Sequence, residues 1–317
     1  MEKEIISPLV SVVVITYNSS QYVIETLESV RDQIYSNIEL IITDDCSTDN
    51  TIELCKEWVK CNNSRFVRVE ILTSIINTGV PGNCNRGYSA AHGEWIKGIA
   101  GDDILTKDGI EKFIREYNGY DLVVFGNCRS FYVDDFGVKV FNDTLYPEKY
   151  QKTIFNLDVH QQFNELLNQC LLCAPSSIIK KTLLQKVGCY DERYRRIEDW
   201  PFWLKCTRNN FRLAYQPVLL AYYRTNHGSI TSHKGTWYNE SYYQDRLCFI
   251  INDILPHVSK WNLLYWEDYY INRLTHLILY KYFGNIKTPC SRIVEKLLVL
   301  LSPKKILFSI YYKLRSN

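Results

Sequence analysis

The sequence has no long apolar run and no strong excess of charge of either sign. The most apolar stretches near its end, residues 293–301 and 306–312, are separated by Ser302-Pro303-Lys304-Lys305 and are much shorter than the roughly 18 residues of a membrane span. The formal net charge of +2 gives no support for nucleic-acid binding through bulk electrostatics, so we expect no nucleic-acid partner. The opening residues, Met1-Glu2-Lys3-Glu4, are charged and lack an apolar stretch, so we also expect no signal peptide and a cytoplasmic location.

The 11 cysteines form neither a disulfide framework nor a zinc-binding pattern. They are an odd number, spread through predicted strands and helices. Cys170 and Cys173 have the spacing of many zinc ligands, but no second pair and no histidine cluster accompanies them. Their apolar neighbours predict two buried thiols, which is consistent with a reducing cytosol.

Two common nucleotide-binding signatures are also missing. No G-x-G-x-x-G turn follows the first predicted strand, which argues against a dinucleotide-dependent oxidoreductase. No G-x-x-x-x-G-K-[ST] loop is present, which argues against a P-loop NTPase.

The first half of the chain alternates between strand and helix patterns. Residues 9–16, 38–43, 67–72 and 95–100 are β-branched or apolar runs that predict buried strands. A Gly- and Asn-rich turn, residues 77–83, precedes a predicted helix over residues 84–91. This alternation predicts an α/β fold with a mostly parallel sheet and right-handed crossovers.

The pattern past residue 103 is more mixed. Thr106 is the expected cap of a helix over residues 110–117, a strand is expected at 121–126, and Asp134-Asp135-Phe136-Gly137 is a hairpin candidate. Further strands are expected at 176–180 and 218–223, with helices at 181–187, ended by Gly188, and through 202–206. From about residue 236 the composition is helical and aromatic, so we expect an α/β domain over residues 1–235 and a helical segment over 236–317.

Polar side chains follow three of the predicted strands where each strand ends. They are Thr16-Tyr17-Asn18, Asp44-Asp45 and Asp102-Asp103. In a doubly wound sheet these ends share one edge. A ring and a carboxylate suit a nucleotide base, and paired carboxylates suit a divalent cation on a diphosphate. The alternatives are that Asp102-Asp103 caps a helix, that Tyr17 is an ordinary strand-end aromatic, and that one of Asp44 and Asp45 caps the following helix.

Over residues 7–230 the sequence resembles the family 2 glycosyltransferases of GT-A fold. The motifs that carry this resemblance, in chain order, are Val12-Val13-Val14-Ile15-Thr16-Tyr17-Asn18, Glu39-Leu40-Ile41-Ile42-Thr43-Asp44-Asp45-Cys46-Ser47-Thr48-Asp49, Asn77-Thr78-Gly79, Gly101-Asp102-Asp103, Val187-Gly188-Cys189-Tyr190-Asp191-Glu192, Glu198-Asp199-Trp200 and Tyr223-Arg224. Each motif is short, but their order along the chain is specific.

The resemblance implies inverting transfer of a sugar from a nucleotide-diphosphate donor, with uridine the expected base, to a saccharide acceptor in cell-surface polysaccharide synthesis. It places Asp199, beside Glu198, as the general base, and Asp102 toward a metal, Mn²⁺ or Mg²⁺, with Asp103 beside it. Trp200 and Trp203 are expected on the acceptor side, and His227 is a third candidate metal ligand. The expected donor-binding residues are Thr16, Tyr17, Asn18, Asp44, Asp45, Asn77, Gly79, Arg86, Asp102 and Asp103.

The chain departs from the family pattern in two places. The common D-x-D has Ala100 in its first position, which leaves the metal one fewer acidic neighbour. Arg86 lies two positions from the arginine that many members carry, which puts its reach to the phosphates in doubt. Alternatives stay open for other residues: Glu198-Asp199 as a solvated helix start, His227 as a plain loop residue, and Trp200 and Trp203 as core.

Two other functions compete with this interpretation. A nucleotidyltransferase that makes nucleotide sugars needs a Gly-rich basic loop after its first strand, which Tyr17-Asn18-Ser19-Ser20 does not provide. A non-catalytic, glycosyltransferase-like binding subunit is the second. The C-terminal stretch interleaves basic and apolar residues, which suits either anionic lipid headgroups or a helical appendage or dimer contact. By analogy with similar enzymes we expect peripheral membrane contact and a lipid-linked acceptor.

Overall fold

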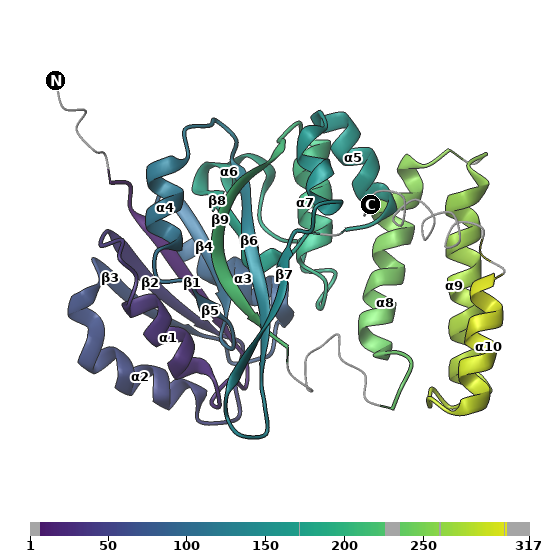
Figure 1. The fold of residues 1–317 in the computed structure, drawn as a ribbon, viewed down its shortest axis with the longest axis horizontal. Helices are drawn as coiled ribbons and strands as arrows, with labels where there is room; N and C mark the ends of the chain where they lie inside the picture. Colours follow the sequence, from purple (N-terminus) through teal and green to yellow (C-terminus); the bar gives the residue numbers. More distant parts are fainter. Residues whose placement is uncertain (1–6, 171, 226–234, 260, 301, 303–317) are drawn as a thin grey trace. The chain divides into compact units, whose positions relative to one another are not determined.

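The structure is a computed structural model that describes residues 7–170, 172–225, 235–259, 261–300 and 302. The chain forms two compact units, one of residues 1–166 and 170–225 and one of residues 167–169 and 226–317 (Figure 1). His227 and residues 303–317, which carry part of the expected metal site and of the basic C-terminal stretch, lie outside the described residues.

One nine-stranded sheet forms the centre of the first unit. Its order is β3-β2-β1-β4-β8-β6-β9-β5, and β7 pairs with β6. The strands are β1 (Val10–Thr16), β2 (Ile38–Asp44), β3 (Arg68–Thr73), β4 (Trp95–Ala100), β5 (Ile104–Leu105), β6 (Val123–Val133), β7 (Lys139–Tyr146), β8 (Ser177–Lys180) and β9 (Leu213–Arg224). The expected parallel arrangement is confirmed for β1 to β4, whereas β8 runs antiparallel to both β4 and β6.

The register of the parallel strands brings their carboxyl ends level. Thr16 of β1 pairs with Asp44 of β2, and Ile15 pairs with Ala100 of β4. The polar groups that follow β1, β2 and β4 therefore begin at one edge of the sheet.

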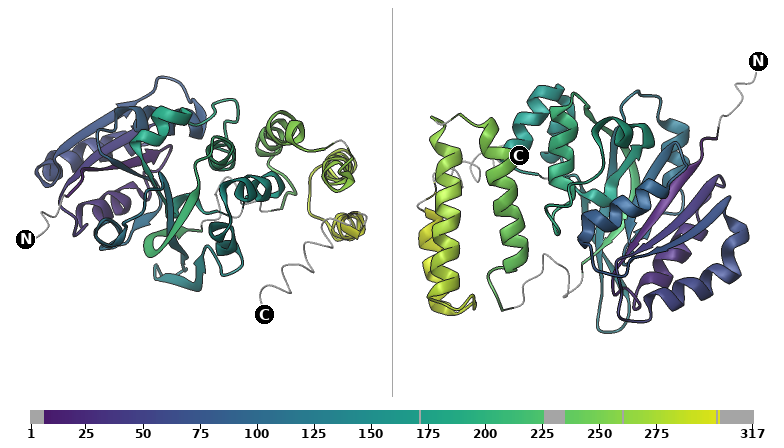
Figure 2. Two further views of the ribbon diagram at one scale, coloured as in Figure 1. Left: turned by 90° about the horizontal axis from the view of Figure 1, so that it is seen from above. Right: turned by 180° about the vertical axis from the view of Figure 1, so that it is seen from behind.

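Helices cover both faces of this sheet, as the views in Figure 2 show. In the first unit they are α1 (Val23–Arg31), α2 (Thr51–Asn62), α3 (Gly79–Ala90), α4 (Gly109–Glu116), α5 (Val159–Asn168), α6 (Lys181–Val187) and α7 (Asp199–Arg208), with 3₁₀ turns at Asn63–Arg65, Gln151–Asn156 and Ala174–Ser176. The face that carries Val12 and Val14 packs on α1, α2 and α4. The opposite face carries Val13 and packs on α3 through Gly87.

Two helix starts differ from the sequence prediction. The first, α3, begins at Gly79 rather than near residue 84, because the side chain of Asp45 accepts the N–H groups of Thr78 and Gly79. The second, α4, begins after Asp108, and Thr106 does not cap it because its hydroxyl donates to the Leu219 carbonyl at 2.5 Å.

The predicted hairpin and the predicted helix stop are confirmed. The turn between β6 and β7 closes with the N–H of Gly137 donating to the Asp134 carbonyl at 3.0 Å. Gly188 follows α6 with a φ of +76°, a left-handed conformation that favours glycine.

The second unit is helical where it is described. It contains α8 (Glu240–Phe249), a π-helical turn (Ile250–Ile254), a 3₁₀ turn (Leu255–His257), α9 (Leu263–Lys281) and α10 (Pro289–Leu300). The loop after α9 returns to the segment before α8, where the N–H of Trp237 donates to the Asn285 carbonyl at 3.0 Å. Searching the described part of the chain for a helix with the length and apolarity to span a bilayer gives none.

Gly87 provides a stability prediction, because it lies where α3 meets the sheet. A Cβ at this position would lie 2.5 Å from Val13 Cγ1 and 2.9 Å from Thr43 Cγ2. Replacing a glycine in a helix by alanine normally stabilises the helix by up to about 1 kcal/mol. We expect Gly87→Ala instead to lower the free energy of unfolding by about 1–3 kcal/mol, measured by urea denaturation. Ser89→Ala, at an exposed site on the same helix, should stay within about 0.5 kcal/mol, and equal stabilities of the two variants would contradict the packing described.

Candidate active site

Hydrogen bonds to the Asp44 side chain join the end of β1 to the end of β2. Its Oδ1 accepts hydrogen bonds from Thr16 Oγ1 at 2.8 Å and Ser47 Oγ at 2.5 Å, and its Oδ2 accepts the N–H of Ser47 at 2.8 Å. The N–H of Asn18 donates to the same Ser47 hydroxyl at 2.8 Å, which fixes the turn after β1. With these partners the carboxylate is only 1% exposed. The chain after β1, which includes Tyr17, is therefore positioned by Asp44.

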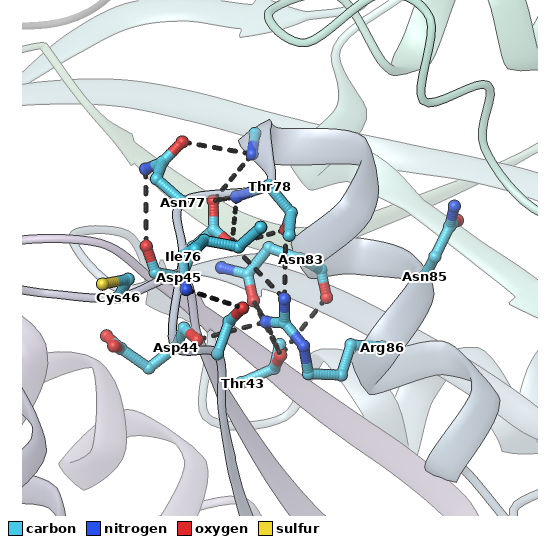
Figure 3. A network of polar contacts seen from close by, with 12 residues as sticks. Thr43, Asp44, Asp45, Cys46, Ile76, Asn77, Thr78, Asn83, Asn85 and Arg86 are labelled. Carbon is cyan, nitrogen blue, oxygen red and sulfur yellow. Dashed lines mark hydrogen bonds and ion pairs between the residues drawn. The ribbon is translucent and has the colours of Figure 1, made fainter.

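Asp45 performs a different task, because it caps a helix distant in sequence. Its carboxylate accepts the N–H of Thr78 at 2.9 Å, the Thr78 hydroxyl at 2.5 Å and the N–H of Gly79 at 2.8 Å, all at the start of α3 (Figure 3). The sequence left open that Asp44 or Asp45 caps α2, but neither does. Asp49 accepts the first N–H of that helix, from Thr51, at 3.1 Å.

Arg86 belongs to the same network. Its guanidinium donates to the Asp44 carbonyl at 3.1 Å, to Asn83 Oδ1 at 2.9 Å and to Thr78 Oγ1 at 3.0 Å (Figure 3). The structure thus brings Asp44, Asp45 and Arg86 together as a frame, with the two carboxylates at most 2% exposed. Tyr17, at the same edge, is 50% exposed, so among these residues its ring is the accessible apolar surface.

Asn77 and Gly79 join the start of α3 to the segment before α7. The guanidinium of Arg195 donates to the Asn77 carbonyl at 2.6 Å and to its Oδ1 at 3.0 Å, and the N–H of Val80 donates to the Arg195 carbonyl at 3.0 Å. A Cβ on Gly79, whose φ is +84°, would lie 2.8 Å from that carbonyl oxygen. Glycine is needed here both for its conformation and for the close approach.

Asp102 and Asp103 follow β4 at the centre of the edge. The N–H of Gly101 donates to the Ile15 carbonyl at 2.8 Å, which holds this turn against β1. Asp103 Oδ1 accepts the N–H of Arg224 at 2.8 Å, whereas its buried Oδ2 has no hydrogen-bond partner among the described residues. Since α4 begins only after Asp108, the pair is not a helix cap.

Arg224 holds the aspartate pair, and sequence reasoning did not select it as a site residue. Its Nε donates to the Asp102 carbonyl at 2.7 Å, and its guanidinium forms an ion pair with Glu25 of α1. The guanidinium also lies 4.5 Å from the ring centre of Tyr22. A buried arginine beside two acids is a recognisable signal once the fold is known, but no local spacing joins residues 25, 102 and 224.

The electrostatics of this pair suit a cation. Burial raises the pKa of Asp102, and burial together with the neighbouring Asp102 carboxylate raises the pKa of Asp103 well above its usual range. A divalent cation would relieve this repulsion and give Asp103 Oδ2 the partner that it lacks. No group of three or more Asp, Glu, His or Cys able to hold a metal occurs among the described residues. Two carboxylates are enough for Mg²⁺ or Mn²⁺ when substrate phosphates complete the coordination.

Glu198 and Asp199 lie at the start of α7, as the sequence predicts. Burial, and then the charge of Asp199, raises the pKa of Glu198 to about 8, and burial raises the pKa of Asp199. Asp199 Oδ1 accepts the N–H of Trp200 at 2.7 Å, which fixes the orientation of the carboxylate. A carboxylate with a raised pKa is a better base for a hydroxyl proton.

Cys173 lies within electrostatic range of both acidic pairs. The pKa of the Cys173 thiol is raised by its contact with Cys128, by burial, and by the charges of both Asp103 and Asp199. Lys97 of β4 fixes the residues after Cys173, because its buried Nζ donates to the Pro175 carbonyl at 2.5 Å and the Ser177 carbonyl at 3.2 Å. Burial lowers the pKa of Lys97 to about 8. A lysine inside an apolar strand was a signal that the sequence prediction did not use.

Trp200 and Trp203 differ in burial. Trp203 is fully buried, with ring centres 5.0 Å from Phe125 and 5.1 Å from Phe202, so its expected place on the acceptor side is wrong and it belongs to the core. Trp200 is partly buried, and its Nε1 donates to the Leu166 carbonyl at 2.7 Å. Its expected role on the acceptor side stays a prediction.

Comparison with known proteins shows what this arrangement is similar to. The profile of glycosyl transferase family 2 matches residues 11–188, more than half of the chain. Glycosyltransferase GlyG of Streptococcus pneumoniae serotype 4 is 31% identical over 234 residues, which are 71% of this chain and 73% of GlyG. In fold, the chain is similar to S. aureus TarS 1–349 in complex with UDP-GlcNAc, with a TM-score of 0.57, 18% identity and coverage of 94% of this chain and 88% of TarS 1–349. It is also similar to the mannosyltransferase PcManGT from Pyrobaculum calidifontis in complex with GDP-Man and Mn²⁺, with a TM-score of 0.50, 15% identity and coverage of 95% and 73%. The fold is GT-A, with a helical C-terminal part.

The raised pKa of Glu198 leads to a prediction on the pH dependence of stability. Because the folded pKa of about 8 exceeds the unfolded value near 4.5, the folded state binds the proton more tightly, and stability falls as pH rises through this window. We expect Glu198→Gln to be more stable than the unmodified chain by about 1–3 kcal/mol at pH 8, with the difference vanishing near pH 4. Chemical denaturation at both pH values measures this. Glu57→Gln, at an exposed position on α2, is the control, and a Glu198→Gln variant that gains nothing at pH 8 would exclude the buried charge.

Proposed function

The chain belongs to glycosyl transferase family 2, and from that premise we propose that it transfers a sugar, with inversion, from a nucleotide-diphosphate sugar to a saccharide hydroxyl. That it is a glycosyltransferase follows from the family; the donor and acceptor are our proposal. The main observation behind this proposal is the aspartate pair at the end of β4, where a buried Asp103 oxygen has no hydrogen-bond partner among the described residues.

For the donor we propose a UDP-sugar bound at the ends of β1, β2 and β4. The half-exposed ring of Tyr17 would stack on the base, and the frame of Asp44, Asp45 and Arg86 would hold Tyr17 and the start of α3 in place. The TarS complex with UDP-GlcNAc and the PcManGT complex with GDP-Man support a nucleotide-diphosphate sugar as the ligand class.

For the metal we propose that Asp102 and Asp103 hold Mn²⁺ or Mg²⁺ together with the diphosphate. When bound, the ion would stabilise the negative charge that develops on the departing nucleotide diphosphate. The chain's own contribution is to keep both carboxylates together: Arg224 fixes the backbone of Asp102 and one oxygen of Asp103. The Mn²⁺ in the PcManGT complex agrees with this proposal.

For the base we propose Asp199. Inversion requires one displacement, in which the acceptor hydroxyl attacks the anomeric carbon and loses its proton to a carboxylate. Asp199 Oδ1 is oriented by the N–H of Trp200, and the raised pKa increases the affinity of the carboxylate for that proton. Glu198, whose pKa burial and the charge of Asp199 raise to about 8, would hold a proton at neutral pH beside the Asp199 carboxylate.

Replacement of Asp103 tests the metal and donor site. Asp103→Asn removes a charge that burial disfavours, so thermal stability should be unchanged or higher, while turnover should fall at least about 100-fold through loss of charge stabilisation. Release of nucleoside diphosphate from UDP- and GDP-sugars, with and without Mn²⁺, measures this. Asp135→Asn, at the exposed hairpin tip, is the matched control. Full activity of Asp103→Asn would remove the pair from the mechanism.

Replacement of Asp199 tests the base separately from donor binding. Asp199→Asn keeps the shape and the hydrogen bond to Trp200 but removes basicity, so transfer should fall by roughly 100-fold or more. The affinity for UDP, measured by calorimetry, should change less than about threefold. A loss of UDP affinity with transfer preserved would instead place Asp199 in the donor pocket.

We further propose that the acceptor is lipid-linked and that the enzyme contacts an anionic membrane. In α10, Ile293, Leu297 and Leu300 are exposed. They are four and three positions apart, which places them on one face of the helix, and Lys296 beside them is also exposed. Flotation with anionic liposomes at low salt should recover the chain, and the double change Lys296→Glu with Leu297→Ser should reduce recovery severalfold. Lys56→Glu on α2 is the control. If the unmodified chain does not float, the membrane proposal fails.

A further inference from the structure

A cavity of about 140 Å³ lies within the second unit, between α8 and α9. The two helices run side by side in the views of this unit in Figures 1 and 2. Among the residues whose side chains the structure describes, the lining combines tyrosine rings, amides, one guanidinium and two aliphatic side chains, and includes no acidic residue. The lining residues used below are Tyr238, Asn239, Tyr242, Arg246, Tyr269 and Asn272.

The walls of this cavity are held by aromatic packing. Tyr243, which also lines it, stacks on His276 of α9 with ring centres 3.7 Å apart, and Tyr238 lies 5.5 Å from Tyr243. His276 Nε2 lies 2.8 Å from a carboxylate oxygen of Glu240 at the start of α8. On the α9 side, Arg273 contacts the Tyr269 hydroxyl at 2.9 Å. The rings are therefore fixed from both helices, which lowers the entropy cost of placing a ligand against them.

The backbone at one end of the cavity is also unusual. Ile250, a lining residue, begins the π-helical turn that follows α8. Such turns are rare and occur frequently at functional sites.

The composition and size of the cavity exclude several ligand classes. A volume near 140 Å³ is well below the roughly 300–1,000 Å³ of pockets for drug-sized ligands, so a whole nucleotide sugar does not fit. A cation would have no acidic partner among the described lining residues, and a lipid chain would meet amides and a guanidinium. A small ring with polar groups on its rim and an apolar face matches both the tyrosine rings and the amides of the lining.

We propose that this cavity binds one sugar ring of the acceptor saccharide, through residues other than those that carry the chemistry. A pyranose ring presents C–H groups on its faces, which suit tyrosine rings, and hydroxyls on its rim, which suit the amides of Asn239 and Asn272 and the guanidinium of Arg246. This inference rests on the proposed function for the identity of the ligand as a saccharide.

Saturation-transfer NMR with the full chain tests the site directly. The probes are N-acetylglucosamine, N-acetylgalactosamine, glucose, galactose, rhamnose and glucuronate, each titrated to the millimolar concentrations at which single rings bind. At least one probe should bind saturably. Arg246→Met and Asn272→Ala, which alter different helices, should each weaken that binding about tenfold or more.

Matched controls separate the cavity from the rest of the chain. Arg292→Met on α10 and Asn252→Ala in the π-helical turn alter exposed residues outside the lining and should leave the affinity unchanged. UDP binding, measured in parallel, should be unchanged in all four variants; its absence from the unmodified chain would contradict the proposed function and not the cavity. The inference is overturned if no probe binds saturably, or if binding persists in both cavity variants.

Discussion

The hydrogen bonds of the Asp45 carboxylate hold together the parts of the chain on which the site depends. Asp45 directly follows β2, yet its partners are the N–H groups at the start of α3, more than thirty residues later. A carboxylate at a helix N-terminus satisfies donors that the helix itself leaves unpaired, and it interacts favourably with the helix dipole. The same turn of α3 contacts the segment before α7 through Arg195. One buried carboxylate thus links the edge of the sheet where β1, β2 and β4 end to the helix that begins with Asp199.

The acids of the site differ in how completely they are satisfied. Asp44 and Asp45 are buried and surrounded by donors, and this makes them structural supports. Asp103 is also buried but keeps one oxygen without a partner among the described residues, beside a second acid. Burying a carboxylate in this way costs stability, and such costs concentrate at functional sites. This contrast separates the residues that hold the site from those that we propose do its chemistry.

Much of this could be predicted from the sequence, because it depends on local pattern. The strands over residues 10–16, 38–44 and 95–100 are mostly apolar or β-branched runs, and their common edge follows from parallel topology. The polar groups at that edge could be named for the same reason. What sequence could not supply were interactions between distant residues: the Asp45 cap on α3, which moved the start of that helix to Gly79, and the Arg224 contacts with Asp102 and Glu25. Trp203 was misplaced because a helical aromatic has the same local pattern whether it faces a ligand or the core.

We propose that Asp102 and Asp103 hold a divalent cation and a nucleotide diphosphate beside Tyr17, and the chemistry of the site depends on this. The most direct measurement is a crystal structure of the chain soaked with UDP and Mn²⁺, with anomalous scattering recorded at the manganese edge. We expect one anomalous peak coordinated by Asp103 Oδ2 and the diphosphate, with the base against the Tyr17 ring. A nucleotide bound elsewhere, or a peak that leaves both aspartates without metal, would contradict it.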